Sequence, residues 1–127
     1  MRGRLLTWVL RIQAGLYLVT GLWPLAHMPS FERVTGPKLD DWLVYTVGLL
    51  LASIGATLWV GSRRPTAPTV MLAALAALSL AAIDTFFALA GRISSIYLLD
   101  AAAELALVVA LALGVRQARR GGSPHSR

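Results

Sequence analysis

Residues 96–115 read IYLLDAAAELALVVALALGV, an apolar run that is interrupted by two carboxylates, Asp100 and Glu104. The run is long enough for one membrane crossing, because a hydrocarbon core about 30 Å thick takes about 20 apolar residues in a helix. Since residues four apart stack on one helix face, both acids lie on the same side of this helix. Charged groups are costly in hydrocarbon, so this face is expected to point toward protein or water.

Three other segments approach the same length and apolar character, and the whole chain of 127 residues is 57% hydrophobic and only 14% charged. Such a composition lies outside the range that is usual for soluble domains. The sequence therefore predicts an all-α fold, a polytopic four-helix transmembrane bundle in a single domain over residues 1–120, with helices at about 5–25, 42–60, 69–90 and 96–115. The polar, glycine-rich tail over residues 121–127 is expected to be disordered.

The distribution of basic residues over the short connections predicts the orientation of the bundle. One side carries Arg2, Arg4, Arg63, Arg64, Arg116, Arg119 and Arg120. The other side has fewer basic residues, and most of them share a connection with acids: Arg33, Lys38 and Arg92, with Glu32, Asp40 and Asp41. Both termini are therefore expected to be cytoplasmic.

Several classes of function lack the residues that they need. The net charge of +6 is spread singly or in pairs beside apolar runs, without the basic and aromatic surface that nucleic-acid binding requires. The chain has no cysteine, which excludes thiol redox chemistry, and its two histidines, His27 and His125, lie at a membrane edge and in the tail. No nucleotide-binding, zinc-protease or serine-hydrolase motif is present. We expect no cofactor and no metal site, and we assign no catalytic residue.

Four charged residues fall inside the predicted spans: Arg11, Asp84, Asp100 and Glu104. At 1.5 Å per residue, Asp84 and Asp100 reach nearly the same depth, about 7–8 Å outside the midplane, and Glu104 lies near the midplane. The acids are candidates for one outward-facing cluster. Arg11, about 6 Å inside the midplane, can pair with Glu104 or extend to the cytoplasmic surface. The alternatives are helix-end stabilisation for Asp100 and a structural hydrogen bond for Glu104.

The first outer connection, HMPSFERVTGPKLDDW over residues 27–42, is the least apolar part of the chain. Thr35, Gly36 and Pro37 predict a turn, and Asp40 or Asp41 can cap the second helix. Trp42 and Tyr45 are aromatics of the kind that line membrane interfaces and are candidate ligand contacts. The connection either covers the acids as a lid or anchors the interface.

Stripes of small residues predict which helix faces meet protein, because small side chains let helices approach closely. One such stripe predicts that Asp84 faces the bundle: Ala73, Ala77, Ala81, Asp84 and Ala88. A second stripe, on helix 42–60, is Gly48, Ala52 and Ala56. A third lies about 200° from Asp100 and Glu104 on the last helix, where it could form a homodimer contact: Ala102, Ala106, Ala110 and Gly114.

Three blocks, GLYLVTGLWPL, VTGPKLDDWLVYTVG and AIDTFFALAGRISSIYLLDAAAE, resemble a family of small bacterial four-helix membrane proteins with no established activity. This resemblance implies a bacterial inner (plasma) membrane location. The helix number, the aromatic outer connection and the intramembrane acids also resemble DoxX-like and EXPERA-type membrane proteins, some of which bind or isomerise sterols. The histidine that acts in the sterol isomerases has no intramembrane counterpart here, so the likeness is one of architecture.

These patterns favour an integral membrane protein that binds a lipid-like or cationic amphiphilic small molecule in an outward-facing acidic cavity. The candidate ligand-binding residues are Asp84, Asp100, Glu104, Arg11, Trp42 and Tyr45. Two alternatives remain open, a proton-coupled transporter of small cations and a structural or accessory membrane subunit. An enzyme with two carboxylates as acid and base is the least favoured interpretation. The lipid bilayer is the expected surrounding, and nucleic acid is not an expected partner.

Overall fold

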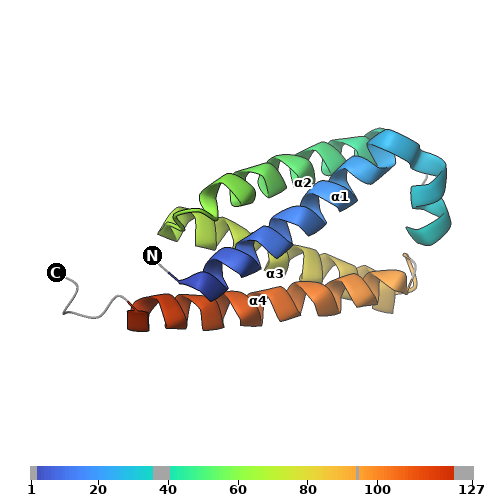
Figure 1. Cartoon of the computed structure of the whole chain (residues 1–127). Helices are drawn as coiled ribbons and strands as arrows, with labels where there is room; N and C mark the ends of the chain where they lie inside the picture. Colours follow the sequence, from blue (N-terminus) through green and yellow to red (C-terminus); the bar gives the residue numbers. More distant parts are fainter. Residues whose placement is uncertain (1–2, 36–40, 94, 122–127) are drawn as a thin grey trace.

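The computed structural model describes residues 3–35, 41–93 and 95–121, and these residues form an all-helical chain. The four helices are α1 (Arg4–Thr35), α2 (Asp41–Gly61), α3 (Ala67–Leu89) and α4 (Ile96–Gly121), and they pack as a four-helix bundle (Figure 1). The predicted fold class is confirmed at this level. The predicted turn residues Gly36 and Pro37, the candidate cap Asp40 and nearly all of the predicted disordered tail, residues 122–127, lie outside the described residues.

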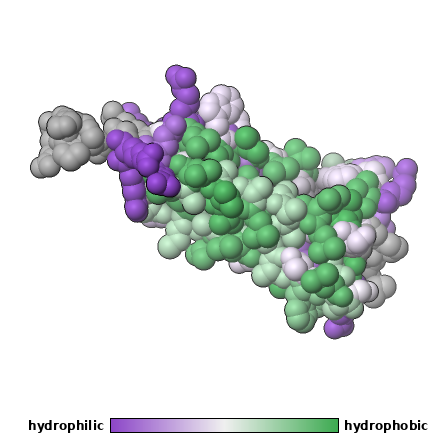
Figure 2. Space-filling view, turned by 90° about the horizontal axis from the view of Figure 1, so that it is seen from below, coloured by the Kyte–Doolittle hydropathy of each residue, from purple (hydrophilic) through white to green (hydrophobic). Residues whose placement is uncertain are grey.

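All four helices are long and apolar enough to cross a membrane. Large apolar side chains cover the outside of the bundle, and Val19, Val60 and Leu89 are each about 70% exposed, at 68%, 70% and 73%. Figure 2 shows this apolar surface along the length of the molecule, with hydrophilic residues gathered toward its two ends. Burial of these side chains in lipid would remove the exposed apolar area that is unusual for a soluble monomer.

Helix α1 is longer than the segment 5–25 that the sequence predicts. It is interrupted at His27 and then continues to Thr35, through residues that were predicted to form a connection. His27 has non-helical backbone angles, φ −157° and ψ 85°, and two helical pieces meet there. Pro29 explains the break, since a proline inside a helix removes one backbone donor and its ring clashes with the carbonyl four residues earlier. Residues 28–35 then resume the helix, and Figure 1 shows this piece turned at the end of the bundle.

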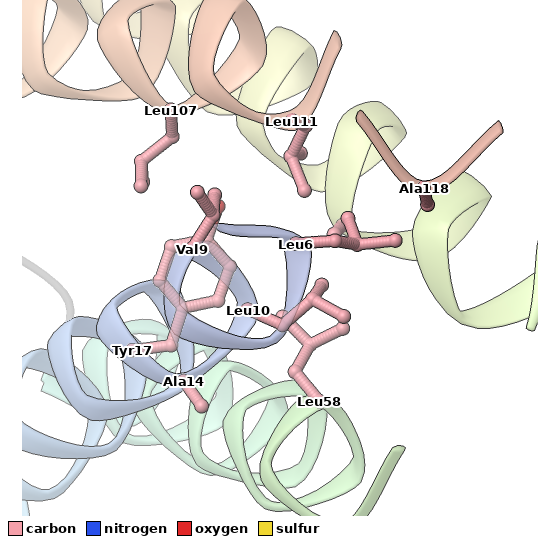
Figure 3. Packing of buried hydrophobic residues seen from close by; sticks show 10 residues of the cluster. Leu6, Val9, Leu10, Ala14, Tyr17, Leu58, Leu107, Leu111 and Ala118 are labelled. Carbon is pink, nitrogen blue, oxygen red and sulfur yellow. The ribbon is translucent and has the colours of Figure 1, made fainter. Parts of the chain in front are cut away.

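The core is centred on α1, which lies along both α2 and α4, while α3 lies along α4. A stripe of α1 with helical spacing is buried, and it includes Leu6, Leu10, Gln13 and Tyr17. Figure 3 shows Leu6, Leu10 and Tyr17 of this stripe with Leu58 of α2 on one side and with Leu107, Leu111 and Ala118 of α4 on the other. Contacts between these apolar side chains hold α2 against one side of α1 and α4 against another.

Glycines allow the closest helix contacts. A Cβ on Gly21 or on Gly48 would strike the carbonyl oxygen of the other, so α1 and α2 meet backbone to backbone at this pair. On α2 the buried small residues are Gly48 and Gly55, whereas Ala56 is exposed, so the predicted stripe is wrong at that position.

On α4 a Cβ on Gly114 would lie 2.9 Å from the Cα of Leu6, so this member of the expected homodimer stripe packs within the chain. Ala102 and Ala106 are exposed, and Ala110 packs partly against the core. The homodimer stays a prediction that rests on the two exposed alanines.

Candidate functional site

A pocket of about 310 Å³ lies among the four helices, near the end of the bundle where α1 and α3 end and α2 and α4 begin. Its wall is mostly apolar. The lining residues are Leu16, Tyr17, Thr20, Pro24 and Phe31 of α1, Leu43, Val44, Val47, Gly48 and Leu51 of α2, Leu80, Ile83 and Asp84 of α3, and Tyr97, Asp100 and Glu104 of α4.

The three acids that the sequence singles out all line this pocket. Asp84 comes from α3, where the stripe of small residues turns it inward, and only 6% of it is exposed. Asp100 and Glu104 come from successive turns of α4. Glu104 is 4% exposed and Asp100 is half-buried, so Glu104 lies deeper in the bundle than Asp100.

Glu104 is held by a hydrogen-bonded chain that crosses three helices. The hydroxyl of Tyr17 donates to Oε2 of Glu104 at 2.8 Å, and Nε2 of Gln13 donates to the Tyr17 hydroxyl at 3.1 Å. The same Gln13 nitrogen donates to the carbonyl oxygen of Ala73 on α3 at 2.9 Å. The Glu104 side chain therefore has a fixed position, because each member of the chain orients the next.

Asp84 has no comparable support. Its Oδ2 atom is buried and has no hydrogen-bond partner among the described residues. The ionisable group that acts most strongly on Asp84 is Asp100, another carboxyl on the wall of the same pocket. Two carboxyl groups in such a pair need a shared proton or a cation between them. A buried acceptor without a protein partner is rare in native structures, and Oδ2 of Asp84 is therefore available to a water or to a ligand group.

The three acids are not arranged as a metal site, because no group of three or more His, Cys, Asp or Glu side chains among the described residues could hold a metal ion. They are instead distributed along one wall of the pocket. A wall of this kind suits a larger polar or cationic group that meets the carboxyls one after another.

The other three candidate site residues lie elsewhere. Nε of Arg11 donates to Oγ of Ser62 at 3.2 Å, and its guanidinium lies 5.8 Å from the ring centre of Trp8 and 5.6 Å from that of Trp59. Arg11 is therefore held at the end of α2 rather than paired with Glu104. Trp42 and Tyr45 are 66% and 37% exposed and are not among the lining residues, because Leu43, Val44 and Val47 form the α2 wall.

The connection over residues 27–42 contributes to the pocket through the second piece of α1, residues 28–35. Phe31 lines the pocket and packs edge-on against Trp23, with ring centres 5.5 Å apart and planes at 86°. Nε1 of Trp23 donates to Oγ of Ser30, which in turn donates to the carbonyl oxygen of His27. This piece therefore borders the pocket, and the lid and the interfacial anchor both stay predictions.

Tyr17 is a site residue that was not predicted, although the spacing of residues along α1 indicates that it is buried. Leu6, Leu10, Gln13 and Tyr17 repeat at helical spacing on the face of α1 that is buried, and Gln13 and Tyr17 are the polar members of this run. A buried polar side chain needs a partner at its own depth, and Glu104 is the acid that lies at that depth on α4.

Comparison with known proteins adds no relative: no family model, no curated protein and no solved structure matches this chain.

Proposed function

We propose that this chain is an integral membrane protein that binds a cationic amphiphile, with the apolar part of the ligand along α2 and α3 and its cationic head at Asp84, Asp100 and Glu104. The observation that carries the proposal is the buried, unpartnered Oδ2 of Asp84 on the wall of a pocket of about 310 Å³ that is otherwise largely apolar. Ligand sites commonly combine an apolar wall with a few converging polar groups in a volume of about 300–1,000 Å³.

The membrane setting of the proposal is supported by the four long apolar helices and by the apolar surface between hydrophilic ends (Figure 2). The end of the bundle that carries both termini and the α2–α3 connection also carries most of the arginines, among them Arg63, Arg64, Arg119 and Arg120. The positive-inside rule assigns this end to the cytoplasm of a bacterial inner membrane. The pocket then lies in the outer half of the bilayer.

A cationic head fits this site better than a neutral one. In a low-dielectric environment a buried carboxylate is costly unless it is paired, and a cation would compensate Asp84 and Asp100 together. The accessory-subunit alternative predicts that each acid has a protein partner of its own, which leaves Oδ2 of Asp84 unexplained. Glu104 has such a partner in Tyr17, so Asp84 and Asp100 are the residues on which charge recognition depends.

Proton-coupled transport of the same class of cation is the second candidate. It is favoured by the position of Glu104, a carboxyl on the pocket wall that is only 4% exposed and could exchange a proton for the bound cation. In this case a proton gradient would drive uptake or release of the cation in proteoliposomes, and Glu104→Gln would abolish the flux while equilibrium binding persisted.

Binding is tested by thermal unfolding of the protein in nanodiscs with three probes that share one alkyl chain: decyltrimethylammonium, decanol and decyl sulfonate. The ammonium probe is expected to raise the melting temperature, because a ligand at 100 times its Kd stabilises the folded state by about 2.7 kcal/mol. The double variant Asp84→Asn/Asp100→Asn should lose this shift. Asp41→Asn, which changes an exposed carboxyl outside the pocket, should keep it.

Equal shifts with decanol and with the ammonium probe would show that the site does not recognise charge. An unchanged melting temperature with all three probes would assign the acids to structure alone and would favour the accessory role.

A further inference from the structure

Close contacts at glycines hold α1 against both α2 and α4. The Gly21–Gly48 pair and Gly55, whose Cβ would lie 2.8 Å from the carbonyl oxygen of Ala14, hold α2 against α1. Gly114 brings α4 to the backbone of Leu6 on α1, and α3 lies along α4. The Gly21–Gly48 contact borders the pocket, whereas the Gly114–Leu6 contact lies at the opposite end of the bundle.

The α2–α3 interface is different, although these helices follow one another in the chain. They are joined by a short connection at residues 62–66 and meet next to it, where a Cβ on Gly61 would strike the side chain of Thr69. Beyond that point they touch little, and Figure 1 shows them diverging toward the other end of the bundle. The pocket lies in this divergence, with walls from both helices.

Side chains at the edge of this opening line the pocket and are also exposed on the outside of the bundle. Leu43 and Val47 of α2 are 44% and 49% exposed, and Ile83 of α3 is 55% exposed. All three are apolar. An opening with apolar edges on the side of an apolar bundle faces lipid hydrocarbon, where it costs nothing to leave these side chains uncovered.

The end of the pocket that faces the aqueous phase is more obstructed. Phe31, from the second piece of α1, lines the pocket there and is 8% exposed, and Trp23 packs edge-on against it. The first turn of this piece is held by the hydrogen bonds between His27 and Ser30.

We propose that the ligand enters and leaves the pocket sideways from the bilayer, through the opening between α2 and α3. The inference rests on the proposed binding function and narrows it, because the ligand must be a cationic amphiphile that is already dissolved in the membrane. A small water-soluble cation would have no reason to use an apolar side opening. Its head passes Val47 and Ile83 and reaches Asp84, and its chain remains between α2 and α3.

The first test locates the opening with nitroxide labels, which is direct because the sequence has no cysteine. Single variants Val47→Cys and Ile83→Cys are labelled in nanodiscs, and spin relaxation by oxygen is compared with relaxation by a water-soluble nickel chelate. Leu50→Cys, 59% exposed and outside the pocket, is the lipid reference, and the exposed Arg92→Cys is the water reference. Both test positions should resemble Leu50, and nickel-chelate accessibility like that of Arg92 would overturn the proposal.

The second test measures passage itself. Val47→Trp narrows the opening, and association and dissociation of decyltrimethylammonium are expected to slow together by about tenfold, which corresponds to a barrier raised by about 1.4 kcal/mol. Leu50→Trp adds the same ring to the same helix outside the pocket and should leave both rates unchanged. Faster dissociation with unchanged association would mean that Val47 is a contact of the bound ligand and not part of the entry path, which would contradict the proposal.

The experiments distinguish a failure of sideways entry from a failure of the binding function. Binding of the ammonium probe that persists with unchanged kinetics in Val47→Trp refutes sideways entry and leaves the binding function standing. Absence of binding to the wild-type protein refutes the function, and with it the entry path.

Discussion

Tyr17 has the most consequential contacts of any residue at the site. It is 2% exposed, donates to Glu104 and accepts from Gln13, and thereby connects α4 to α1 and, through Gln13, to α3. The position of Glu104 in the pocket depends on this hydroxyl. The Tyr17 hydroxyl on α1 thus orients the Glu104 carboxyl on α4.

Tyr17→Phe is expected to lower the free energy of unfolding by about 1–3 kcal/mol, because it leaves Oε2 of Glu104 and one Gln13 donor buried without a partner. Thermal or denaturant unfolding in detergent measures the loss. Tyr45→Phe makes the same chemical change at an exposed position and should be neutral. A Tyr17→Phe protein as stable as the wild type would show that the chain of hydrogen bonds does not hold the site.

Part of the site follows from the sequence. The i, i+4 spacing brings Asp100 and Glu104 to one face, and the small-residue stripe turns Asp84 inward, so all three line one pocket. The placement of Arg11 does not follow, because a long side chain reaches several partners and packing between helices selects Ser62. Trp42 and Tyr45 are exposed, and the rotation of α2 that keeps them out of the pocket depends on where Gly48 meets Gly21.

At the scale of elements, α1 and α2 behave as one packed pair because their backbones meet at glycine. Gly48→Ala should destabilise the bundle by about 1–3 kcal/mol, since the added Cβ meets the carbonyl oxygen of Gly21 and the helices must separate. Gly15→Ala is the matched control: nothing lies within 4 Å of its Cβ, and alanine should stabilise the helix by up to about 1 kcal/mol. Unfolding in detergent compares the two, and equal effects would argue against the glycine contact.

The break in α1 decides whether Phe31 reaches the pocket. Nδ1 of His27 accepts the backbone N–H of Ser30 at 3.2 Å, which is the bond that a helix N-cap makes three residues along. His27→Ala should therefore destabilise residues 28–35 locally by about 1 kcal/mol and speed hydrogen exchange of their amides roughly fivefold. Thr46→Ala on α2 is the control, and unchanged exchange in residues 28–35 would show that His27 does not cap this piece.

The break shows what sequence patterns predict poorly. Pro24, Pro29 and the polar residues after them indicate the end of an apolar span, and the span itself is predicted within a few residues. They do not indicate that HMPSFERVT resumes a helix, because the cap comes from a histidine and the pairing of Trp23 with Phe31 is a tertiary contact. Hydropathy determines where a membrane span ends, but it does not determine where the helix itself ends.

At the scale of the whole molecule, the proposed orientation follows from charge. Single cysteines at Arg64 and Arg92 are suitable probes because both positions are exposed and the native chain has no thiol. In intact cells a membrane-impermeant maleimide should label Arg92→Cys, whereas Arg64→Cys should react only after the membrane is permeabilised. The reverse pattern would place the pocket in the cytoplasmic half of the bilayer, and labelling of both sites in intact cells would contradict a single orientation.

If the pocket holds a cationic amphiphile at Asp84 and Asp100, the ligand should stay bound when the protein is extracted from its own membrane, and native mass spectrometry detects it. Wild type and Asp41→Asn should carry an adduct whose mass and fragments identify an amine or quaternary ammonium compound with an apolar chain. Asp84→Asn/Asp100→Asn should lose that adduct. A neutral or anionic adduct that the double variant retains, or an adduct-free wild type, would contradict the account.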